Sequence, residues 1–207
     1  MLQRIAGHAQ SFAKQQLIYV IGVSLGGNAL LKWLGEKGRN AQKLVTGAAA
    51  ISVPLDLAAA GAALDVGFNQ VYTRHFLNTL KVKAFDKLEQ FPGLFDATAL
   101  KKCSSIYDFD NLVTAPLHGF CNTDDYWRQS SSKQWLEHIQ VPTLVINAQN
   151  DPFMPASVLP TSGQVSPAVS LEFPAEGGHA GFIQGPFPGT LQWLPKRILS
   201  FFHYECT

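Results

Sequence analysis

A serine between two glycines is the first group in this chain that could do covalent chemistry. Ser24 lies within Gly22–Gly26 (Gly-Val-Ser-Leu-Gly), after the apolar run Leu17–Val23 and before the amphipathic stretch Leu25–Glu36. A strand that turns sharply into a helix through Gly-x-Ser-x-Gly is the pattern of a nucleophile elbow. The pattern therefore predicts that Ser24 presents its hydroxyl for attack on a carbonyl carbon.

The residues beside Ser24 fit the same interpretation. Bulk two positions to either side of the serine would clash across the turn, and Gly22 and Gly26 occupy these positions. The helix that begins at Leu25 points its N-terminus at the serine, so the backbone N–H of Leu25 can donate to a developing oxyanion.

A serine hydroxyl needs a base, and the base needs an orienting carboxylate. Asp151 follows the apolar run Thr143–Ala148, and His179 lies in a glycine-flanked loop after a further run, Ala168–Phe173. Groups just past the carboxyl ends of parallel strands gather at one edge of the sheet. We therefore predict a catalytic triad of Ser24, Asp151 and His179, which performs acyl transfer through an acyl-enzyme.

The other histidines are weaker candidates for the base. His118 precedes Gly119, which resembles a His-Gly oxyanion loop, but no convincing strand comes before it. The remaining four fall on predicted helices: His8, His75, His138 and His203.

Short apolar runs alternate with amphipathic stretches along most of the chain, which predicts a doubly wound, mostly parallel α/β sheet. The predicted strands are Leu17–Val23, Leu44–Val53, Thr143–Ala148 and Ala168–Phe173. The predicted helices are Arg4–Gln15, Leu25–Glu36, Thr123–Ile139 and Leu191–Phe202.

The alternation stops between residues 55 and 132, where a largely helical segment carries scattered aromatic residues. It is too long for a simple loop and too apolar for a linker. We predict a helical cap, residues 55–132, inserted in one domain that spans residues 1–207.

Composition narrows the class of protein. The 16 Lys and Arg nearly balance the 15 Asp and Glu, so charge favours neither nucleic acid nor an anionic membrane as partner. The three cysteines are widely spaced, and no residues have the spacing of metal ligands, so we predict no disulfide framework, no metal site and no cofactor.

The N-terminus has no signal-peptide pattern, and the apolar tract Leu44–Leu64 is interrupted by Pro54 and Asp56. We therefore expect a cytoplasmic protein without a transmembrane segment.

The sequence resembles the YheT-like branch of the α/β-hydrolases, bacterial relatives of the mammalian ABHD-type esterases and lipases. The resemblance extends over nearly the whole chain. It is carried by short matching segments at residues 22–28, 52–56, 71–80, 114–120, 125–127, 151–154 and 177–182. The resemblance implies an α/β-hydrolase fold and hydrolysis of carboxylic esters by Ser24, Asp151 and His179. It also implies a small-molecule ester or lipid-like substrate, namely short- or medium-chain acyl esters or monoacylglycerols.

Two departures from the family pattern matter. Family members usually carry a second acidic residue where Asn150 stands, which leaves Asp151 as the candidate acid. The strands that normally precede the elbow, with a His-Gly loop that supplies a second oxyanion donor, have no counterpart before Ser24. We thus expect an N-terminally truncated hydrolase in which the strand at residues 17–23 exposes an edge and could pair with the missing segment.

Two alternatives remain open. The chain could be an inactive or incomplete fragment, because loss of one oxyanion donor typically costs about 2.7–4 kcal/mol of transition-state stabilisation. It could also be an acyltransferase that uses the same triad with an alcohol or thiol in place of water.

Overall fold

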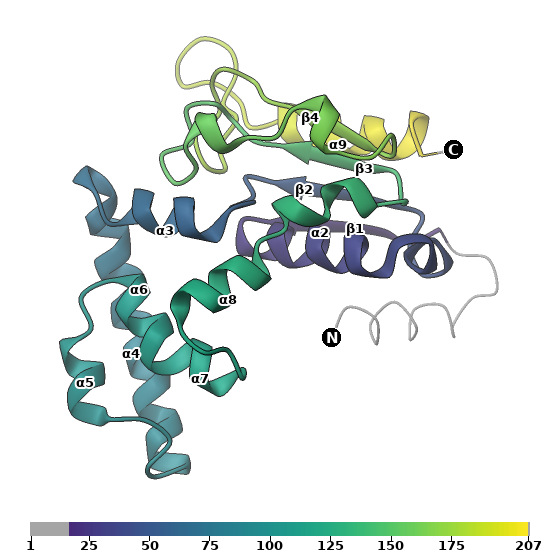
Figure 1. The fold of residues 1–207 in the computed structure, drawn as a ribbon. Coiled ribbons are helices and arrows are strands. Elements are labelled where there is room, and N and C mark those ends of the chain that lie inside the picture. Colours follow the sequence, from purple (N-terminus) through teal and green to yellow (C-terminus); the bar gives the residue numbers. More distant parts are fainter. Residues whose placement is uncertain (1–16, 207) are drawn as a thin grey trace. The chain divides into compact units, whose positions relative to one another are not determined.

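A computed structural model describes residues 17–206, which form two compact units (Figure 1). The sheet unit contains the described residues up to Leu55 and from Ser131 onward, and the helical unit is Asp56–Ser130. The helical unit begins one residue after the predicted start of the insertion and ends two residues before its predicted end. The predicted helix Arg4–Gln15 lies outside the described residues.

Four parallel strands form the sheet, in the order β1-β2-β3-β4. They are β1 (Tyr19–Val23), β2 (Gly47–Ile51), β3 (Thr143–Ile146) and β4 (Val169–Glu172). The register places their last residues in one row: Val23, Ile51, Ile146 and Glu172. The predicted parallel α/β architecture is confirmed, and the chain leaves all four strands at the same edge of the sheet.

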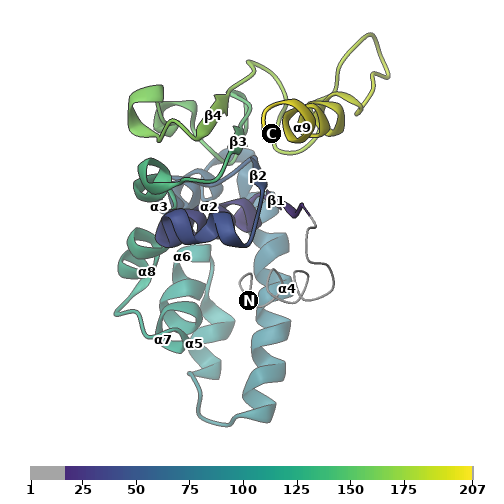
Figure 2. The same cartoon turned by 90° about the vertical axis from the view of Figure 1, so that its right-hand side faces the viewer.

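Helices cover both faces of the sheet, because alternate strand residues point to opposite sides. The buried cluster on one face joins α2 (Leu25–Lys37) to β2 and β3 through residues that include Leu30, Leu34, Ala48, Ala50 and Val145. The cluster on the other face joins α9 (Trp193–Tyr204) to the same strands through residues that include Ala49, Ile51, Leu144, Ile146 and Phe201. Figure 2 shows the two helices on opposite sides of the strands.

The second strand is shorter than the predicted Leu44–Val53. Leu44 and Val45 both donate their N–H groups to the carbonyl of Ala41, which closes a turn before β2 begins. At the other end, Ser52 has a φ of 51°, a left-handed conformation that cannot continue a strand.

The predicted helix Thr123–Ile139 is wrong as one element. It is two pieces, α8 (Thr123–Ser130) and a 3₁₀ segment, Lys133–His138. Between them the N–H of Ser132 donates to the Asn28 side chain, and the N–H of Lys133 donates to the Leu55 carbonyl. Because these donors bond to distant residues, the α-helical hydrogen-bond ladder cannot pass through them.

The outer edge of β1 is exposed in the part of the chain that the structure describes. There β1 pairs only with β2, and Ile21 and Val23 are 53% and 51% exposed. Pairing of this edge with a further segment stays a prediction.

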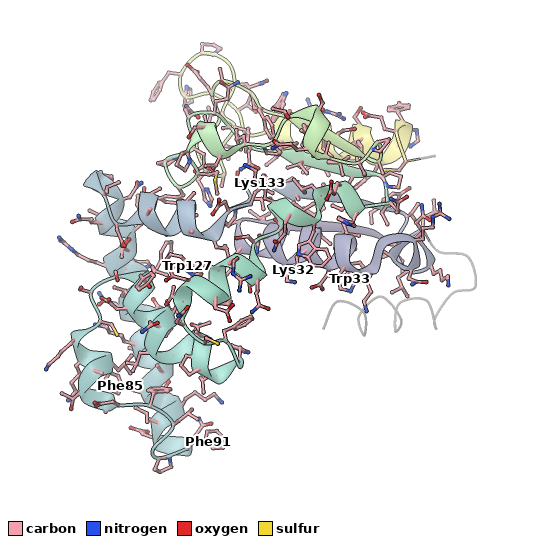
Figure 3. The ribbon with its side chains drawn as sticks, in the orientation of Figure 1. Lys32, Trp33, Phe85, Phe91, Trp127 and Lys133 are labelled. Carbon is pink, nitrogen blue, oxygen red and sulfur yellow. The ribbon has the colours of Figure 1, made fainter. Side chains whose placement is uncertain are left out.

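The helical unit has its own core. It contains α3 (Leu57–Leu64), α4 (Gln70–Gln90), α5 (Ala97–Lys102), α6 (Ile106–Phe109), α7 (Ala115–Leu117) and α8, with a π-helical turn at Asp110–Thr114 between α6 and α7. Its buried cluster comprises Leu77, Ala84, Leu100, Phe109 and Val113. Phe85, labelled in Figure 3, packs against this cluster, whereas Phe91 at the end of α4 is exposed.

Trp127 on α8, labelled in Figure 3, contacts both α3 and the π-helical turn of the helical unit. Its ring fills the space above Gly61, where a Cβ would lie 2.3 Å from the indole, so α3 and α8 can pack closely only with glycine there. Its Nε1 donates to Asp110 at 2.8 Å. Burial raises the pKa of the Asp110 carboxyl, and hydrogen bonds from Thr114 and Trp127 partly oppose that rise.

No helix within residues 17–206 combines the length and the apolar composition needed to cross a bilayer.

A buried amide ties the ends of two neighbouring strands together. Asn147, which follows β3, accepts from the N–H of Val53 at 3.1 Å and donates to the Val53 carbonyl at 3.0 Å. The residue is fully buried. The Val53 N–H, just past β2, is therefore satisfied by this side chain, whereas the Val53 carbonyl accepts from both Asn147 and the N–H of Leu55 at 2.9 Å.

We expect Asn147→Ala to lower the free energy of unfolding by about 1–3 kcal/mol, because it leaves the buried N–H of Val53 without its hydrogen-bond acceptor. Gln42→Ala is the matched control. It removes an exposed side-chain amide that bonds to the Gln140 carbonyl, and should change stability by no more than about 0.5 kcal/mol. Urea denaturation of both variants measures the difference, and equal losses would contradict the role given to Asn147.

Candidate active site

Ser24 forms the turn between β1 and α2 in a strained conformation. Its φ of 52° and ψ of −126° lie outside the regions that side-chain-bearing residues normally occupy. The N–H of Ser24 donates to the Ile51 carbonyl at 2.8 Å, and the Ser24 carbonyl accepts from Gly27 and Asn28 in the first turn of α2. The backbone of the serine is thus held from both the neighbouring strand and the helix.

Two glycines make the turn possible, but only one of them was predicted. A Cβ on Gly22 would lie 2.7 Å from the Gly26 carbonyl oxygen and from the Gly27 Cα, as the steric argument requires. A Cβ on Gly26 meets no atom within 4 Å outside its own helical turn, so the predicted steric role of Gly26 is wrong. The crowded position is Gly27, where a Cβ would lie 2.6 Å from a methyl group of Val53. Sequence reasoning missed it because Val53 follows the next strand.

The oxyanion donor predicted at Leu25 lies where a helix can supply it. Leu25 is the first residue of α2, directly after Ser24. The first N–H groups of a helix have no carbonyl partner within that helix and carry the positive end of its dipole.

Asp151 follows β3 and is buried. Its carboxylate is fully shielded from solvent, and Oδ1 accepts from the N–H of Phe153 at 2.9 Å. The Nδ1 atom of His179 lies 2.9 Å from the Asp151 Oδ2 and 3.2 Å from the Oδ1. A buried carboxylate in this position fixes the orientation of the imidazole ring.

His179 reaches the site from a tight loop after β4. Gly178 takes a φ of 59°, and a Cβ on Gly177 would lie 2.6 Å from the Phe182 ring. Phe182 is buried and its N–H donates to the Gly177 carbonyl at 2.9 Å, which closes the loop around the histidine.

The structure brings the three predicted residues together within the sheet unit. The Nε2 of His179 lies 3.0 Å from the Ser24 Oγ, although the two residues are 155 positions apart in the chain. With Nδ1 on Asp151 and Nε2 on Ser24, the imidazole bridges a carboxylate and a hydroxyl. This arrangement can move a proton from the serine to the histidine while the carboxylate balances the new charge.

Two further residues lie beside this group, one against the His179 ring and one against the backbone before it, and neither role was predicted. The ring of Phe153 meets the His179 ring edge to face, with centroids 4.6 Å apart. Asn150 accepts hydrogen bonds from the N–H groups of Gly177 and Gly178. Their positions close to Asp151 were a signal in the sequence, as was the departure of Asn150 from the family pattern.

The remaining histidines lie elsewhere. His118 ends α7 in the helical unit, His75 is on α4, His138 ends the 3₁₀ segment and His203 is on α9, whereas His8 lies outside the described residues. Residues 17–206 contain no group of three or more His, Cys, Asp or Glu side chains arranged to hold a metal ion.

Comparison with known proteins assigns the chain to a family. The chain matches the alpha/beta hydrolase fold family over residues 10–186. It therefore belongs to the α/β-hydrolases, and within that family it is YheT-like.

The chain is also similar to curated proteins that are named as esterases or lipases. It is 39% identical over 199 residues to YheT of Escherichia coli (strain K12), a candidate esterase by its name. That match covers 95% of this chain and 56% of YheT. It is 29% identical to the phospholipase ABHD3 of Mus musculus and 28% identical to the monoacylglycerol lipase ABHD2 of Homo sapiens. Those matches cover 97% and 95% of this chain, and 49% and 50% of the relatives. The chain thus spans about half the length of the curated relatives it matches.

Solved structures share the fold at low identity. The acylaminoacyl peptidase of Pyrococcus horikoshii superimposes with a TM-score of 0.54 at 15% identity, over 98% of this chain and 27% of that one. Acetyl xylan esterase 1 from Thermoanaerobacterium sp. JW/SL YS485 gives a TM-score of 0.51 at 14% identity, over 97% of this chain and 50% of that one.

We expect Gly22→Ala and Gly27→Ala each to destabilise the chain by about 1–3 kcal/mol, because each added methyl group forces neighbouring atoms apart. Gly26→Ala is the control and should be neutral or stabilising by up to about 1 kcal/mol, since alanine favours the helix. Denaturant titration measures all three.

A second substitution separates the two clashes. Val53→Ala should reduce the cost of Gly27→Ala, whose clash is with the Val53 side chain, but not that of Gly22→Ala, whose clash is with backbone. An equal loss of stability from Gly26→Ala and Gly22→Ala would contradict the assignment.

Proposed function

We propose that this chain carries the catalytic triad of a carboxylic-ester hydrolase, with Ser24 as nucleophile, His179 as general base and Asp151 as the orienting acid. The observation that carries the proposal is the continuous contact from the Ser24 Oγ through His179 to the buried Asp151, at 3.0 and 2.9 Å. The esterase and lipase names of the relatives support the reaction class.

The reaction proceeds by acyl transfer. The His179 Nε2 takes the proton of the Ser24 hydroxyl as its oxygen attacks the ester carbonyl carbon. The resulting oxyanion lies at the N-terminus of α2, where the N–H of Leu25 and the helix dipole stabilise it. His179 then returns the proton to the departing alcohol, which leaves the acyl group on Ser24.

Water completes the cycle. His179 removes a proton from a water molecule that attacks the acyl-enzyme, and the carboxylic acid leaves with Ser24 restored. Asp151 stays ionised and balances the imidazolium in both half-reactions. The substrate class we propose is short- or medium-chain acyl esters or monoacylglycerols, and the similarity to the monoacylglycerol lipase ABHD2 supports the last of these.

The helical unit is the proposed cap of this enzyme. It is inserted between β2 and β3 of the sheet unit and carries exposed aromatic side chains, Phe68, Tyr72 and Phe76 among them.

We expect a fluorophosphonate probe to label the parent chain and not Ser24→Ala, and ester hydrolysis by this variant to fall on the order of 10⁴-fold or more. Ser52→Ala is the matched control. Ser52 follows the adjacent strand, is buried, also has a positive φ, and its hydroxyl has no hydrogen-bond partner within residues 17–206, so its loss should leave labelling intact. A folded parent chain that stays unlabelled would sink the proposal.

Substrate class is tested with p-nitrophenyl esters of increasing acyl length. We expect kcat/KM to peak at short or medium chains, as the proposed substrate class requires. A steady rise toward long chains would contradict the proposed preference. Consumption of an added alcohol or thiol in preference to water would identify an acyltransferase instead.

A further inference from the structure

The loop that carries His179 is fixed firmly behind the histidine. Phe182 is 2% exposed, stacks on Trp193 with ring centroids 5.5 Å apart, and donates its N–H to the Gly177 carbonyl. Gly177 itself is packed so closely that a Cβ would lie 2.8 Å from the Cβ of Ala148. The loop is therefore anchored in the apolar core of the sheet unit at Phe182, after the histidine, and by the packing of Gly177, before it.

The near end of the loop is held by one polar side chain. The Oδ1 atom of Asn150 accepts from the N–H of Gly177 at 3.0 Å and from the N–H of Gly178 at 2.9 Å. Gly178 is the residue directly before His179, and Asn150 is the residue directly before Asp151. One oxygen atom thus links the loop that supplies the acid to the loop that supplies the base.

We propose that Asn150 is a positioning residue for His179: its side-chain oxygen holds the Gly177–Gly178 backbone so that the imidazole spans Asp151 and Ser24, and as an amide it does so without adding a charge. This inference rests on the proposed function for its catalytic consequence. The clamp itself is a structural feature that can be measured in the absence of any activity.

The geometry explains why a clamp is needed at this place. Gly178 has a φ of 59° and a Cβ there would meet no atom within 4 Å, so packing does not fix the backbone directly before the histidine. The imidazole must nonetheless keep both of its contacts, at 2.9 Å to Asp151 and 3.0 Å to Ser24. A small displacement of a catalytic group can cost roughly a hundredfold in rate.

The charge of the clamp also matters. Within residues 17–206 the His179 ring contacts Asp151, the Ser24 hydroxyl and the ring of Phe153, and of these three Asp151 carries the charge. Glu176 is exposed in the same loop. A carboxylate in place of the Asn150 amide could accept the same two hydrogen bonds, but it would put a second negative charge near the imidazole and favour its protonated form.

The first test measures the clamp by amide hydrogen exchange at Gly177 and Gly178. We expect Asn150→Ala to speed exchange at both amides by about tenfold or more, and Asn150→Asp to keep them protected. Gln149→Ala is the matched control, since it removes an exposed hydrogen bond from the same segment to the Phe173 carbonyl, outside the histidine loop. Unchanged exchange in Asn150→Ala would overturn the proposal.

The second test measures the consequence for the base. We expect Asn150→Ala to lower kcat roughly tenfold to a hundredfold, with KM changed by less than about threefold. Asn150→Asp should restore most of this kcat at high pH, but the pH at which half the activity is lost on acidification should rise by roughly half a unit or more. This pH rises because a nearby carboxylate stabilises the imidazolium, so the neutral base exists only at higher pH.

The outcomes are separable. Equal losses of kcat in Asn150→Ala and Gln149→Ala, or an Asn150→Asp profile that does not move, would overturn the positioning role. If the parent chain hydrolyses no ester, the proposed function fails, but the clamp is still judged by the two amides and by NMR titration of the His179 ring. Thermal unfolding of each variant shows whether a loss reflects a displaced histidine or an unfolded chain.

Discussion

The register of the parallel sheet is the constraint on which the candidate site depends. Because the last residues of the four strands stand in one row, the chain leaves every strand at the same edge. Ser24, Asp151 and His179 follow three of these strands, at one, five and seven residues past the strand ends. A parallel sheet therefore gathers groups that are up to 155 positions apart without requiring long loops.

The turn at Ser24 shows how a strained backbone is kept in place. A residue in such a conformation costs on the order of 1–3 kcal/mol, and it persists only where its surroundings fix it. Here the serine N–H bonds to β2, the serine carbonyl caps the first turn of α2, and Gly22 and Gly27 allow strand and helix to approach. The buried apolar face of α2 then holds the helix against the sheet.

Side-chain amides of three asparagines hydrogen-bond to backbone groups near the candidate site. Asn147 satisfies the backbone of Val53 at the end of β2, and Asn28 on α2 accepts from Ser132 at the start of the segment that leads to β3. Asn150 does the same for the glycines before His179. Asparagine suits these places because one short side chain can both accept and donate without the cost of burying a charge.

Much of the fold and of the site could be predicted from short segments. The runs that became β1, β3 and β4 were placed to within two residues, and α2 began where the elbow pattern required. The predicted helix Thr123–Ile139 was wrong because its central N–H groups bond to Asn28 and Leu55, which no local pattern reports. The role given to Gly26 was wrong because crowding at a glycine depends on what packs there, and Val53 packs on Gly27.

The sequence by itself determined the candidate chemistry: a serine at a strand-to-helix turn, followed in order by an aspartate and a histidine after later strands. Those features depend on residue type and neighbouring residues, so they can be recognised one segment at a time. Only the tertiary structure decided which glycine is crowded, that the Asp151 carboxylate is buried, and that Asn150 holds the histidine loop. These depend on contacts between residues more than 25 positions apart, which exist only once the strands have paired.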